Sequence, residues 1–340
     1  MSADSGVDET VAYPFAADPA RGTVFMLPMR LRDFRAASFL DERLLEGRSG
    51  GNWLAREQWT ALAEAIEPQP LHFIFHIGHA GSTLISRLLD ETGVVLGLRE
   101  PLALRQMAEA FDFASGDGET ERLAQMLDLL LRQWAQPIGG TTHTILKATS
   151  SAARLARRLL TLRPEARALY LHLDAETYLA TLLAGANSAQ DLNAHGPERL
   201  FRLRRNLRDD TLPQPQSLGE LAAMSFLAET MTRKAVTAQF GTRVQPLDFH
   251  AFLQNRGHHI ARILRHFGLD LSADATAALT DSAVFQQYSK APEQHYSPGE
   301  RAQILARAGA DYADEIARGK DWLDRMASRH EAAKGAMMET

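Results

Sequence analysis

The sequence predicts an α/β fold of three layers, in which a central parallel sheet is flanked by helices. Short apolar segments that suit buried strands alternate with longer amphipathic segments that suit helices between residues 71 and 184, and this alternation is typical of a parallel sheet. The chain of 340 residues suffices for one such domain with helical additions at its N-terminal and C-terminal ends. We predict a flexible tail over residues 1–22, one domain over residues 23–330 and a second tail over residues 331–340.

The individual elements follow from hydrophobic spacing and from the glycines and prolines between them. Ahead of the sheet, residues 24–27 form a short apolar segment and residues 53–66 have helical spacing. The expected strands cover residues 71–77, 94–96, 144–147, 168–173 and 244–247. The expected helices cover residues 82–90, 119–134, 151–162, 176–184, 218–240, 253–267 and 298–323, with a polar loop over residues 281–297.

Composition is that of an ordinary globular protein and excludes several kinds of chemistry. Apolar residues make up 45% of the chain and charged residues 23%. The net charge of −5 argues against a nucleic-acid-binding surface, because such surfaces are usually basic. The chain has no cysteine, so disulfides, thiolate zinc sites and a cysteine nucleophile are excluded. No signal peptide or membrane span is visible, and we therefore expect a cytoplasmic protein.

One segment has the pattern of a phosphate-binding loop. A predicted strand runs into a turn with Gly78 and Gly81, and a helix is predicted to begin at Ser82. The unpaired N–H groups and the dipole at the start of such a helix attract anions. The glycines let the backbone approach a phosphate, so a branched side chain at Gly81 would occupy phosphate space. The pattern predicts a P-loop fold of the kind found in nucleoside triphosphatases, with the loop over residues 76–83; the alternative is that the glycines serve only the turn.

The loop departs from the common pattern G-x-x-x-x-G-K-[ST]. His76 stands in the place of the first glycine and Ser82 in the place of the lysine. The usual magnesium–nucleotide machinery is therefore not expected, and no metal site is predicted. His258 and His259 resemble a metal-binding pair only superficially, because adjacent residues on a helix diverge by about 100°.

The loop resembles the phosphosulfate loop of the sulfotransferases. His79-Ala80-Gly81-Ser82-Thr83 has a histidine where that family has a lysine or arginine. Further along, Gly97-Leu-Arg-Glu-Pro101, Ile145-Leu-Lys147 and the segment from Val244 to Leu269 are similar to later parts of the family, in the same order. The resemblance covers about residues 71–290.

This resemblance implies transfer of a sulfuryl group from 3′-phosphoadenosine 5′-phosphosulfate, as co-substrate and without a metal, to a hydroxyl or amine of a small-molecule or peptide acceptor. Glu100 is the candidate base and Lys147 the candidate partner of the bridging oxygen, whereas His79 would add positive charge. Glu100 could instead favour a helix N-terminus, and Lys147 could be a solvated residue at a strand end. The loop residues expected to bind the adenine nucleotide are His76, Gly78, His79, Ala80, Gly81, Ser82 and Thr83.

The likeness fails at the site for the 3′-phosphate of the nucleotide. The family usually has an arginine at the end of the fourth strand and a serine eight residues later, where this chain has Leu173 and Thr181. Thr181 keeps a hydroxyl there, and Arg154 or Lys290 are the candidates to replace the missing charge. His76 is expected to donate a hydrogen bond or simply to pack.

Two questions stay open at this point. The arginine-rich segment over residues 199–208 could bind phosphate or an anionic acceptor, or it could form an exposed helix face. The competing hypothesis for the whole chain is a nucleotide-binding relative without sulfuryl transfer, either a kinase-like phosphotransferase or a regulatory protein. A kinase needs an acidic magnesium ligand after a strand, and Asp174 is the one obvious candidate.

Overall fold

The computed structural model describes residues 9–46, 48–185, 188–288, 291–295 and 298–338. The chain divides into two compact units, where we had expected one domain over residues 23–330. Unit 1 contains Met1–Phe75, Ser82–Leu169 and Arg256–Gln294, and unit 2 contains His76–Gly81, Tyr170–Asn255 and His295–Thr340. The short segment His76–Gly81 thus belongs to unit 2, with the later strands and the C-terminal helices, although the residues on either side of it belong to unit 1.

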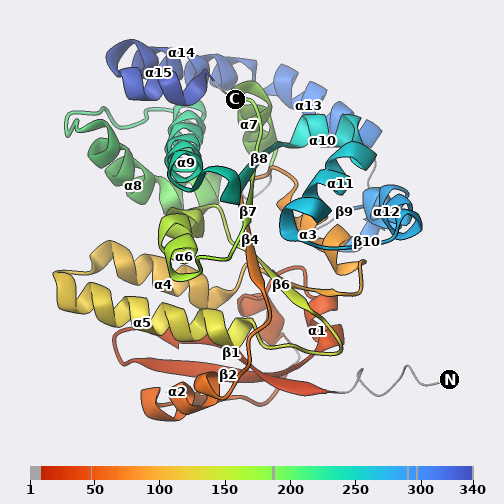
Figure 1. The fold of residues 1–340 in the computed structure, drawn as a ribbon. Coiled ribbons are helices and arrows are strands. Elements are labelled where there is room, and N and C mark those ends of the chain that lie inside the picture. Colours follow the sequence, from red (N-terminus) through yellow and green to blue (C-terminus); the bar gives the residue numbers. More distant parts are fainter. Residues whose placement is uncertain (1–8, 47, 186–187, 289–290, 296–297, 339–340) are drawn as a thin grey trace. The chain divides into compact units, whose positions relative to one another are not determined.

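A five-stranded parallel sheet forms the centre of the fold, with the strand order β5-β6-β4-β7-β8 (Figure 1). Every residue of β4 and β7 is buried, which explains why both strands are continuous apolar or aromatic runs rather than alternating ones. The sheet and its flanking helices confirm the predicted fold class. Its strands are β4 (Leu71–His76), β5 (Val95–Arg99), β6 (His143–Lys147), β7 (Ala168–His172) and β8 (Val244–Asp248).

Unit 1 also contains an antiparallel sheet that the sequence analysis did not anticipate. Its order is β1-β2-β3, with β1 at Thr10–Asp18, β2 at Thr23–Arg30 and β3 at Asn52–Leu54. The expected flexible tail over residues 1–22 is therefore wrong from Thr10 onward. Tyr13 and Phe15 are each 2% exposed, and the burial of these aromatic rings holds the strand in place.

The helices of unit 1 cover β1 and the central strands. The helices α4 and α5 pack against each other and both contact β1 (Figure 1). The polar loop expected over residues 281–297 instead includes a 3₁₀ turn and a short strand pair. The remaining elements of this unit, with η for a 3₁₀ helix, are α1 (Leu31–Ala36), η1 (Glu42–Leu45), α2 (Arg56–Glu64), α3 (Ser82–Asp90), α4 (Leu102–Phe113), α5 (Asp117–Trp134), η2 (Ser151–Leu155), α6 (Ala156–Leu162), α11 (Arg256–Phe267), α12 (Ala273–Thr280), η4 (Ala283–Gln286), β9 (Gln287–Tyr288) and β10 (Ala291–His295).

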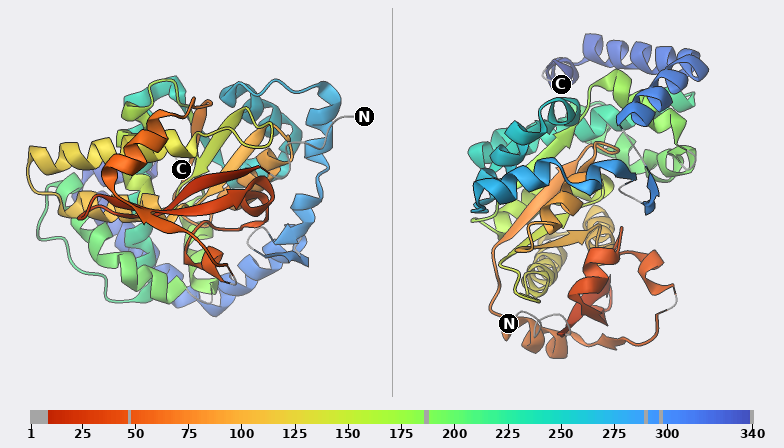
Figure 2. Two further views of the ribbon diagram at one scale, coloured as in Figure 1. Left: turned by 90° about the horizontal axis from the view of Figure 1, so that it is seen from below. Right: turned by 90° about the vertical axis from the view of Figure 1, so that its right-hand side faces the viewer.

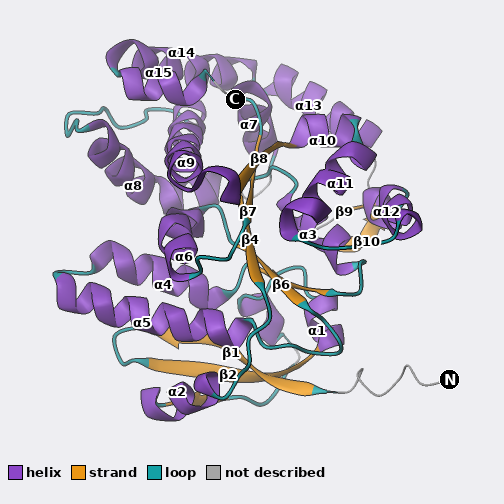
Figure 3. Ribbon diagram, viewed as in Figure 1, coloured by secondary structure: helices purple, strands orange, loops and turns teal. Residues whose placement is uncertain are grey.

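Unit 2 is mostly helical (Figure 3). Its longest helix, α9, is buried on most sides because α7, α8, α14 and α15 all pack against it. A Cβ atom at Gly219 of α9 would lie 1.8 Å from the carbonyl oxygen of Glu315, so this glycine permits the close crossing with α14. The helices are α7 (Ala175–Ala184), α8 (Ser188–Leu207), α9 (Leu218–Phe240), η3 (Gly241–Arg243), α10 (Phe249–Gln254), α13 (Pro298–Asp311), α14 (Ala313–Arg329) and α15 (Glu331–Met337).

The C-terminal helices, blue in Figure 2, differ from the expectation in two ways. The single helix expected over residues 298–323 is interrupted at Tyr312, and α13 and α14 lie on either side of it. The expected tail over residues 331–340 contains α15, whose Ala333 and Ala336 are buried. Among the helices that the structure describes, none is long and apolar enough to cross a membrane.

Candidate active site

Two charged side chains meet at the carboxyl ends of the adjacent strands β5 and β6 in unit 1. Lys147 stands in register with Arg99, the last residue of β5, and Glu100 follows directly. The Nζ of Lys147 donates to the Oε1 of Glu100. The side chain of Lys147 is 1% exposed and that of Glu100 is 16% exposed, so solvent screens this ion pair only weakly. The alternative of a solvated lysine at the strand end is therefore wrong, because the carboxylate compensates the buried charge.

The backbone of Glu100 has an unusual conformation. Its φ angle is 56°, in the left-handed region that residues with a Cβ seldom adopt. Its N–H donates to the carbonyl oxygen of Lys147 at 2.7 Å, which continues the pairing of β5 with β6 past the end of β5. Pro101 follows as the N-cap of α4, which begins at Leu102, and it makes no side-chain capping hydrogen bond. The carboxylate of Glu100 contacts Lys147. Residues with such backbone strain cluster at functional sites.

An arginine and an aromatic ring surround this pair in unit 1. The Nζ of Lys147 lies 5.8 Å from the centre of the Phe39 ring, and the guanidinium of Arg43 lies 3.7 Å from the same centre. The pKa of Arg43 is raised, chiefly by its hydrogen bond to Asp41 and also by the carboxylate of Glu100. Sequence reasoning missed Phe39 and Arg43, because the segment around them has neither a motif nor clear periodicity.

The segment before Glu100 is anchored by a buried arginine. Arg99 is 0% exposed, pairs with Asp90 at the end of α3, and donates to the carbonyl oxygen of Ala37 at 2.8 Å. The N–H of Gly97 donates to Asp90 at 2.8 Å, and a Cβ at Gly97 would lie 2.4 Å from that carboxylate oxygen. The segment from Gly97 to Glu100 therefore fixes the end of β5 against α3.

The turn after β4 adopts the backbone conformation that its glycines predict. The φ angles of Gly78, His79 and Gly81 are 109°, 50° and 72°, all in the left-handed region. The N–H of Gly78 donates to the Nδ1 of the buried His76 at 3.1 Å. Because a ring nitrogen that accepts must be unprotonated, the Nδ1 of His76 accepts here, and the expectation that His76 also donates stays a prediction. His76 thus shapes the turn through its Nδ1.

The space beside Gly81 is occupied within unit 2. A Cβ at Gly81 would lie 2.0 Å from the ring of Phe249, the first residue of α10. The expectation that a side chain at Gly81 would enter phosphate space is therefore wrong, since it would first collide with this ring. Arg301 of α13 lies 5.4 Å from the centre of the same ring. The N–H of Ile77 donates to the carbonyl oxygen of Leu171 at 3.2 Å, which joins the turn to β7.

Comparison with known proteins gives a remote structural likeness. No protein-family profile matches the chain, and no curated protein matches its sequence. A sulfotransferase from Mycobacterium avium matches with 15% identity over 76% of this chain and 79% of that one, at a TM-score of 0.42. One from Mycobacterium tuberculosis H37Rv matches with 15% identity over 84% of each chain, at a TM-score of 0.41. A third sulfotransferase, from Alicyclobacillus acidocaldarius, matches with 16% identity over 74% of this chain and 95% of that one, at a TM-score of 0.38.

The chain is similar in structure to sulfotransferases. In this chain, α3 begins at Ser82 as predicted, and both Ser82 and Thr83 are 5% exposed. Ala80 is fully buried and His79 half-buried. The hydroxyl of Thr181, on α7, donates to the carbonyl oxygen of Thr177 at 2.7 Å. Such a bond to the preceding turn is common for threonine in a helix.

Leu173, Arg154 and Lys290 decide whether a basic residue is available to bind the 3′-phosphate. Leu173, the residue that follows β7, is 0% exposed and belongs to the hydrophobic core. Both Nε and Nη2 of Arg154 donate to Asp112, with Nη2 at 2.7 Å, so a carboxylate already compensates its charge. Lys290 lies outside the described residues. The missing arginine therefore has no replacement among the described candidates that sequence reasoning named.

The arginine-rich segment is largely structural. Arg199 and Arg202 of α8 are 2% and 5% exposed, and both pair with Glu229 of α9 in unit 2. Burial opposes ionisation of Glu229, but the two guanidinium groups outweigh it and lower its pKa. Both earlier alternatives are wrong for these two arginines, which form neither an exposed face nor an accessible anion site. Their partner lies on another helix, which no local pattern reveals.

Proposed function

We propose that this chain transfers a sulfuryl group from 3′-phosphoadenosine 5′-phosphosulfate to a hydroxyl or amine acceptor. The observation that carries the proposal is the buried pair of Glu100 and Lys147 at the carboxyl ends of β5 and β6. Ligands of open α/β sheets bind outside these strand ends. A carboxylate and an ammonium group held together there supply both a proton acceptor and a cation.

The two side chains divide the chemistry between them. Glu100 takes the proton from the acceptor hydroxyl or amine as its oxygen or nitrogen bonds to sulfur. The bond between sulfur and the bridging oxygen of the donor breaks, and Lys147 stabilises the charge that develops on that oxygen. Lys147 contacts Glu100 in the structure, so it must leave the carboxylate to reach the bridging oxygen. The same movement frees Glu100 to accept a proton.

The turn after β4 supports the nucleotide part of the proposal. Its left-handed residues lead directly into α3, whose first N–H groups and dipole favour an anion. The hydroxyls of Ser82 and Thr83 and the imidazole of His79 would add donors to the phosphates. No step of this scheme needs a metal ion, and we propose that the reaction proceeds without one.

A second candidate function is nucleotide binding without sulfuryl transfer. The buried Leu173 favours it, because a leucine offers no donor to a 3′-phosphate. Arg154 is already held by Asp112. If no other cation serves the 3′-phosphate, the chain would bind adenine nucleotides with and without that group about equally.

Calorimetric titration separates the two functions. Adenosine 3′,5′-bisphosphate, AMP and ATP are titrated into separate samples of the full chain. A charge-assisted contact to the 3′-phosphate is worth roughly 1.5–3 kcal/mol, so sulfuryl transfer predicts that the bisphosphate binds about tenfold to a hundredfold more tightly than AMP. Equal affinity for the bisphosphate and AMP would favour the second function.

A further inference from the structure

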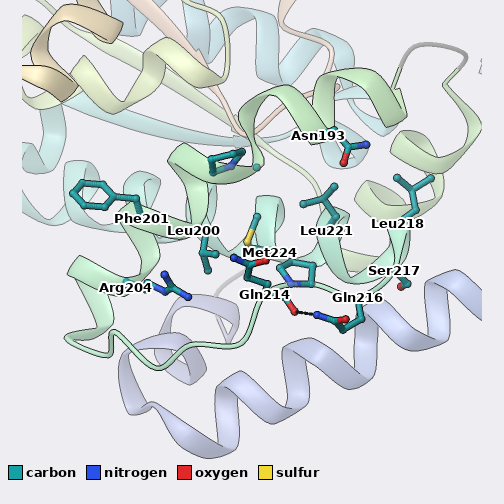
Figure 4. A pocket seen from close by; sticks show the side chains of 13 residues that line it. Asn193, Leu200, Phe201, Arg204, Gln214, Gln216, Ser217, Leu218, Leu221 and Met224 are labelled. Carbon is teal, nitrogen blue, oxygen red and sulfur yellow. Dashed lines mark hydrogen bonds between the residues drawn. The ribbon is translucent and has the colours of Figure 1, made fainter.

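A cavity of about 610 Å³ lies in unit 2, lined by α8, α9 and the segment that joins them (Figure 4). Its volume is in the range of pockets that bind small organic molecules. Leu200, Phe201 and Arg204 line it from α8, and Leu221 and Met224 line it from α9. None of these residues belongs to the proposed catalytic pair or to the phosphate loop.

The joining segment that closes the cavity is fixed at several points. The Nη2 of Arg204 donates to the carbonyl oxygen of Leu212 at 2.9 Å. Asp209 forms an ion pair with Arg329 at 2.7 Å, which ties the segment to the end of α14. These bonds hold the wall in place, so the cavity is formed before a ligand arrives.

The inner wall of the cavity is apolar. Leu200 is 8% and Met224 1% exposed, and Leu221 is half-buried. A Cβ at Gly196 would lie 3.1 Å from Leu221, so the absence of a side chain there lets α8 approach α9. Phe201, 63% exposed, stands at the rim (Figure 4). Asn193, Gln214, Gln216 and Ser217 also line the cavity. The apolar body of a ligand would therefore pack on the wall formed by Leu200, Leu221 and Met224.

A single arginine sets the charge of the cavity. The lining includes no carboxylate, and Arg204 is its one charged residue. Arg204 forms no ion pair within the ranges that the structure describes, and its Nε, though buried, has no hydrogen-bond partner there. This contrasts with Arg199 and Arg202 of the same helix, which share the carboxylate of Glu229. A guanidinium with unused donors favours a planar or tetrahedral oxyanion.

We propose that this cavity binds a small amphipathic monoanion. Its carboxylate or sulfate group contacts the guanidinium of Arg204, and its apolar body packs on Leu200, Leu221 and Met224. The inference does not depend on sulfuryl transfer, because no residue of the proposed reaction contributes to it. Carboxylates and sulfate esters share the required chemistry, and the two are separated by the choice of probe.

The test is calorimetric titration of the full chain with decanoate, decyl sulfate and decanol, each below the concentration at which it forms micelles. We expect one molecule of anion to bind per chain, and the neutral alcohol to bind at least tenfold more weakly. Arg204→Gln should weaken both anions about tenfold or more and leave decanol unchanged. Arg205→Gln, which changes an exposed arginine next to it that does not line the cavity, is the matched control and should change nothing.

A second variant keeps the test decisive if Arg204→Gln does not fold. Leu221→Glu places a carboxylate in the cavity and should abolish binding of both anions while nucleotide titrations stay as in the unchanged chain. Binding of only one of the two anions would identify the preferred head group and supports the proposal. Three outcomes would overturn the proposal. The first is that neither anion gives a heat of binding. The others are that decanol binds as tightly as the anions, or that neither variant weakens anion binding.

Discussion

Lys147 and Glu100 are linked twice, in opposite directions. The Nζ of Lys147 donates to the carboxylate of Glu100, and the N–H of Glu100 donates to the carbonyl oxygen of Lys147 at 2.7 Å. Side chain and backbone are therefore fixed by the same neighbour. The backbone hydrogen bond keeps Glu100 at the strand ends even when the ammonium group of Lys147 moves away from the carboxylate.

We expect Glu100→Gln to keep nucleotide affinity and to lose about 10²–10⁴-fold in the rate of sulfuryl transfer, because an amide cannot take the acceptor proton. The measurement pairs calorimetry with a single-turnover assay. Glu42→Gln is the control, since Glu42 also pairs with an arginine in unit 1 but its side chain is 61% exposed. A near-normal rate in Glu100→Gln would show that the carboxylate is structural.

We expect Gly81→Ala to destabilise the fold by about 2–4 kcal/mol. The new Cβ would strain a left-handed backbone and would collide with the ring of Phe249. Combining it with Phe249→Ala should remove the collision, so the double variant should lose less stability than the sum of the two single variants. Chemical denaturation measures all three.

Gly93→Ala is the matched control for Gly81→Ala. The φ angle of Gly93 is 77°, close to the 72° of Gly81, but no atom lies within 4 Å of its Cβ position. It should therefore show only the backbone strain of about 1–2 kcal/mol. Equal losses of unfolding free energy in Gly81→Ala and Gly93→Ala would mean that the ring of Phe249 moves aside with no loss of stability.

Stability should fall on mild acidification. Burial is the main cause that lowers the pKa of His72 and of His172 to about 4, helped for His172 by Arg233. The unfolded chain takes up these protons near pH 6.5, whereas the folded chain does so only near pH 4. The free energy of unfolding should thus decrease as the pH falls from 6.5 to 4, by about 2 kcal/mol per histidine at pH 5.

Urea denaturation at a series of pH values measures this loss. His72→Phe should remove the contribution of His72 to the pH dependence of the unfolding free energy, so this dependence should become shallower. Phenylalanine keeps an aromatic ring against Phe267, on which His72 stacks. The same pH dependence in this variant, or a stability that does not change between pH 7 and pH 5, would contradict the assignment.

We expect Glu229→Gln to destabilise the chain by about 3–5 kcal/mol, because it leaves the buried Arg199 and Arg202 without their shared carboxylate. Glu198→Gln is the comparison. Glu198 also pairs with Arg202, but its side chain is 21% exposed, so we expect a smaller loss. Thermal unfolding of the two variants side by side gives the difference, and an equal effect would argue against a dominant role for Glu229.

The central sheet was predictable because β4 and β7 are buried along their whole length. Leu71–His76 and Ala168–His172 are apolar or aromatic almost throughout, and a glycine or a proline lies near them. The helix beginning at Ser82 was predicted to the residue. By contrast β1 was missed, since Thr10–Asp18 contains a proline and follows an acidic segment, and its burial comes from helices that lie far along the chain.

The candidate site was predictable only in part. The order of motifs placed Glu100 and Lys147 at strand ends, but their contact depends on the register of β5 against β6. The sequence does not indicate the left-handed backbone of Glu100, because glutamate seldom adopts that conformation. The contact between Phe249 and Gly81 joins positions more than 160 residues apart, and no local pattern links them.

The conformation of Glu100 also bears on how this chain would respond to selection. A left-handed backbone costs about 1–2 kcal/mol with any L side chain and nothing with glycine. Glycine alone would strand the ammonium of Lys147 in the interior, so the favourable exchange is Glu100→Gly together with Lys147→Met. A library selected only for thermal resistance should accumulate that pair, whereas one selected for turnover should retain glutamate and lysine. The two positions would then covary, and the ratio of their frequencies in the two libraries would measure how much stability the pair of glutamate and lysine costs.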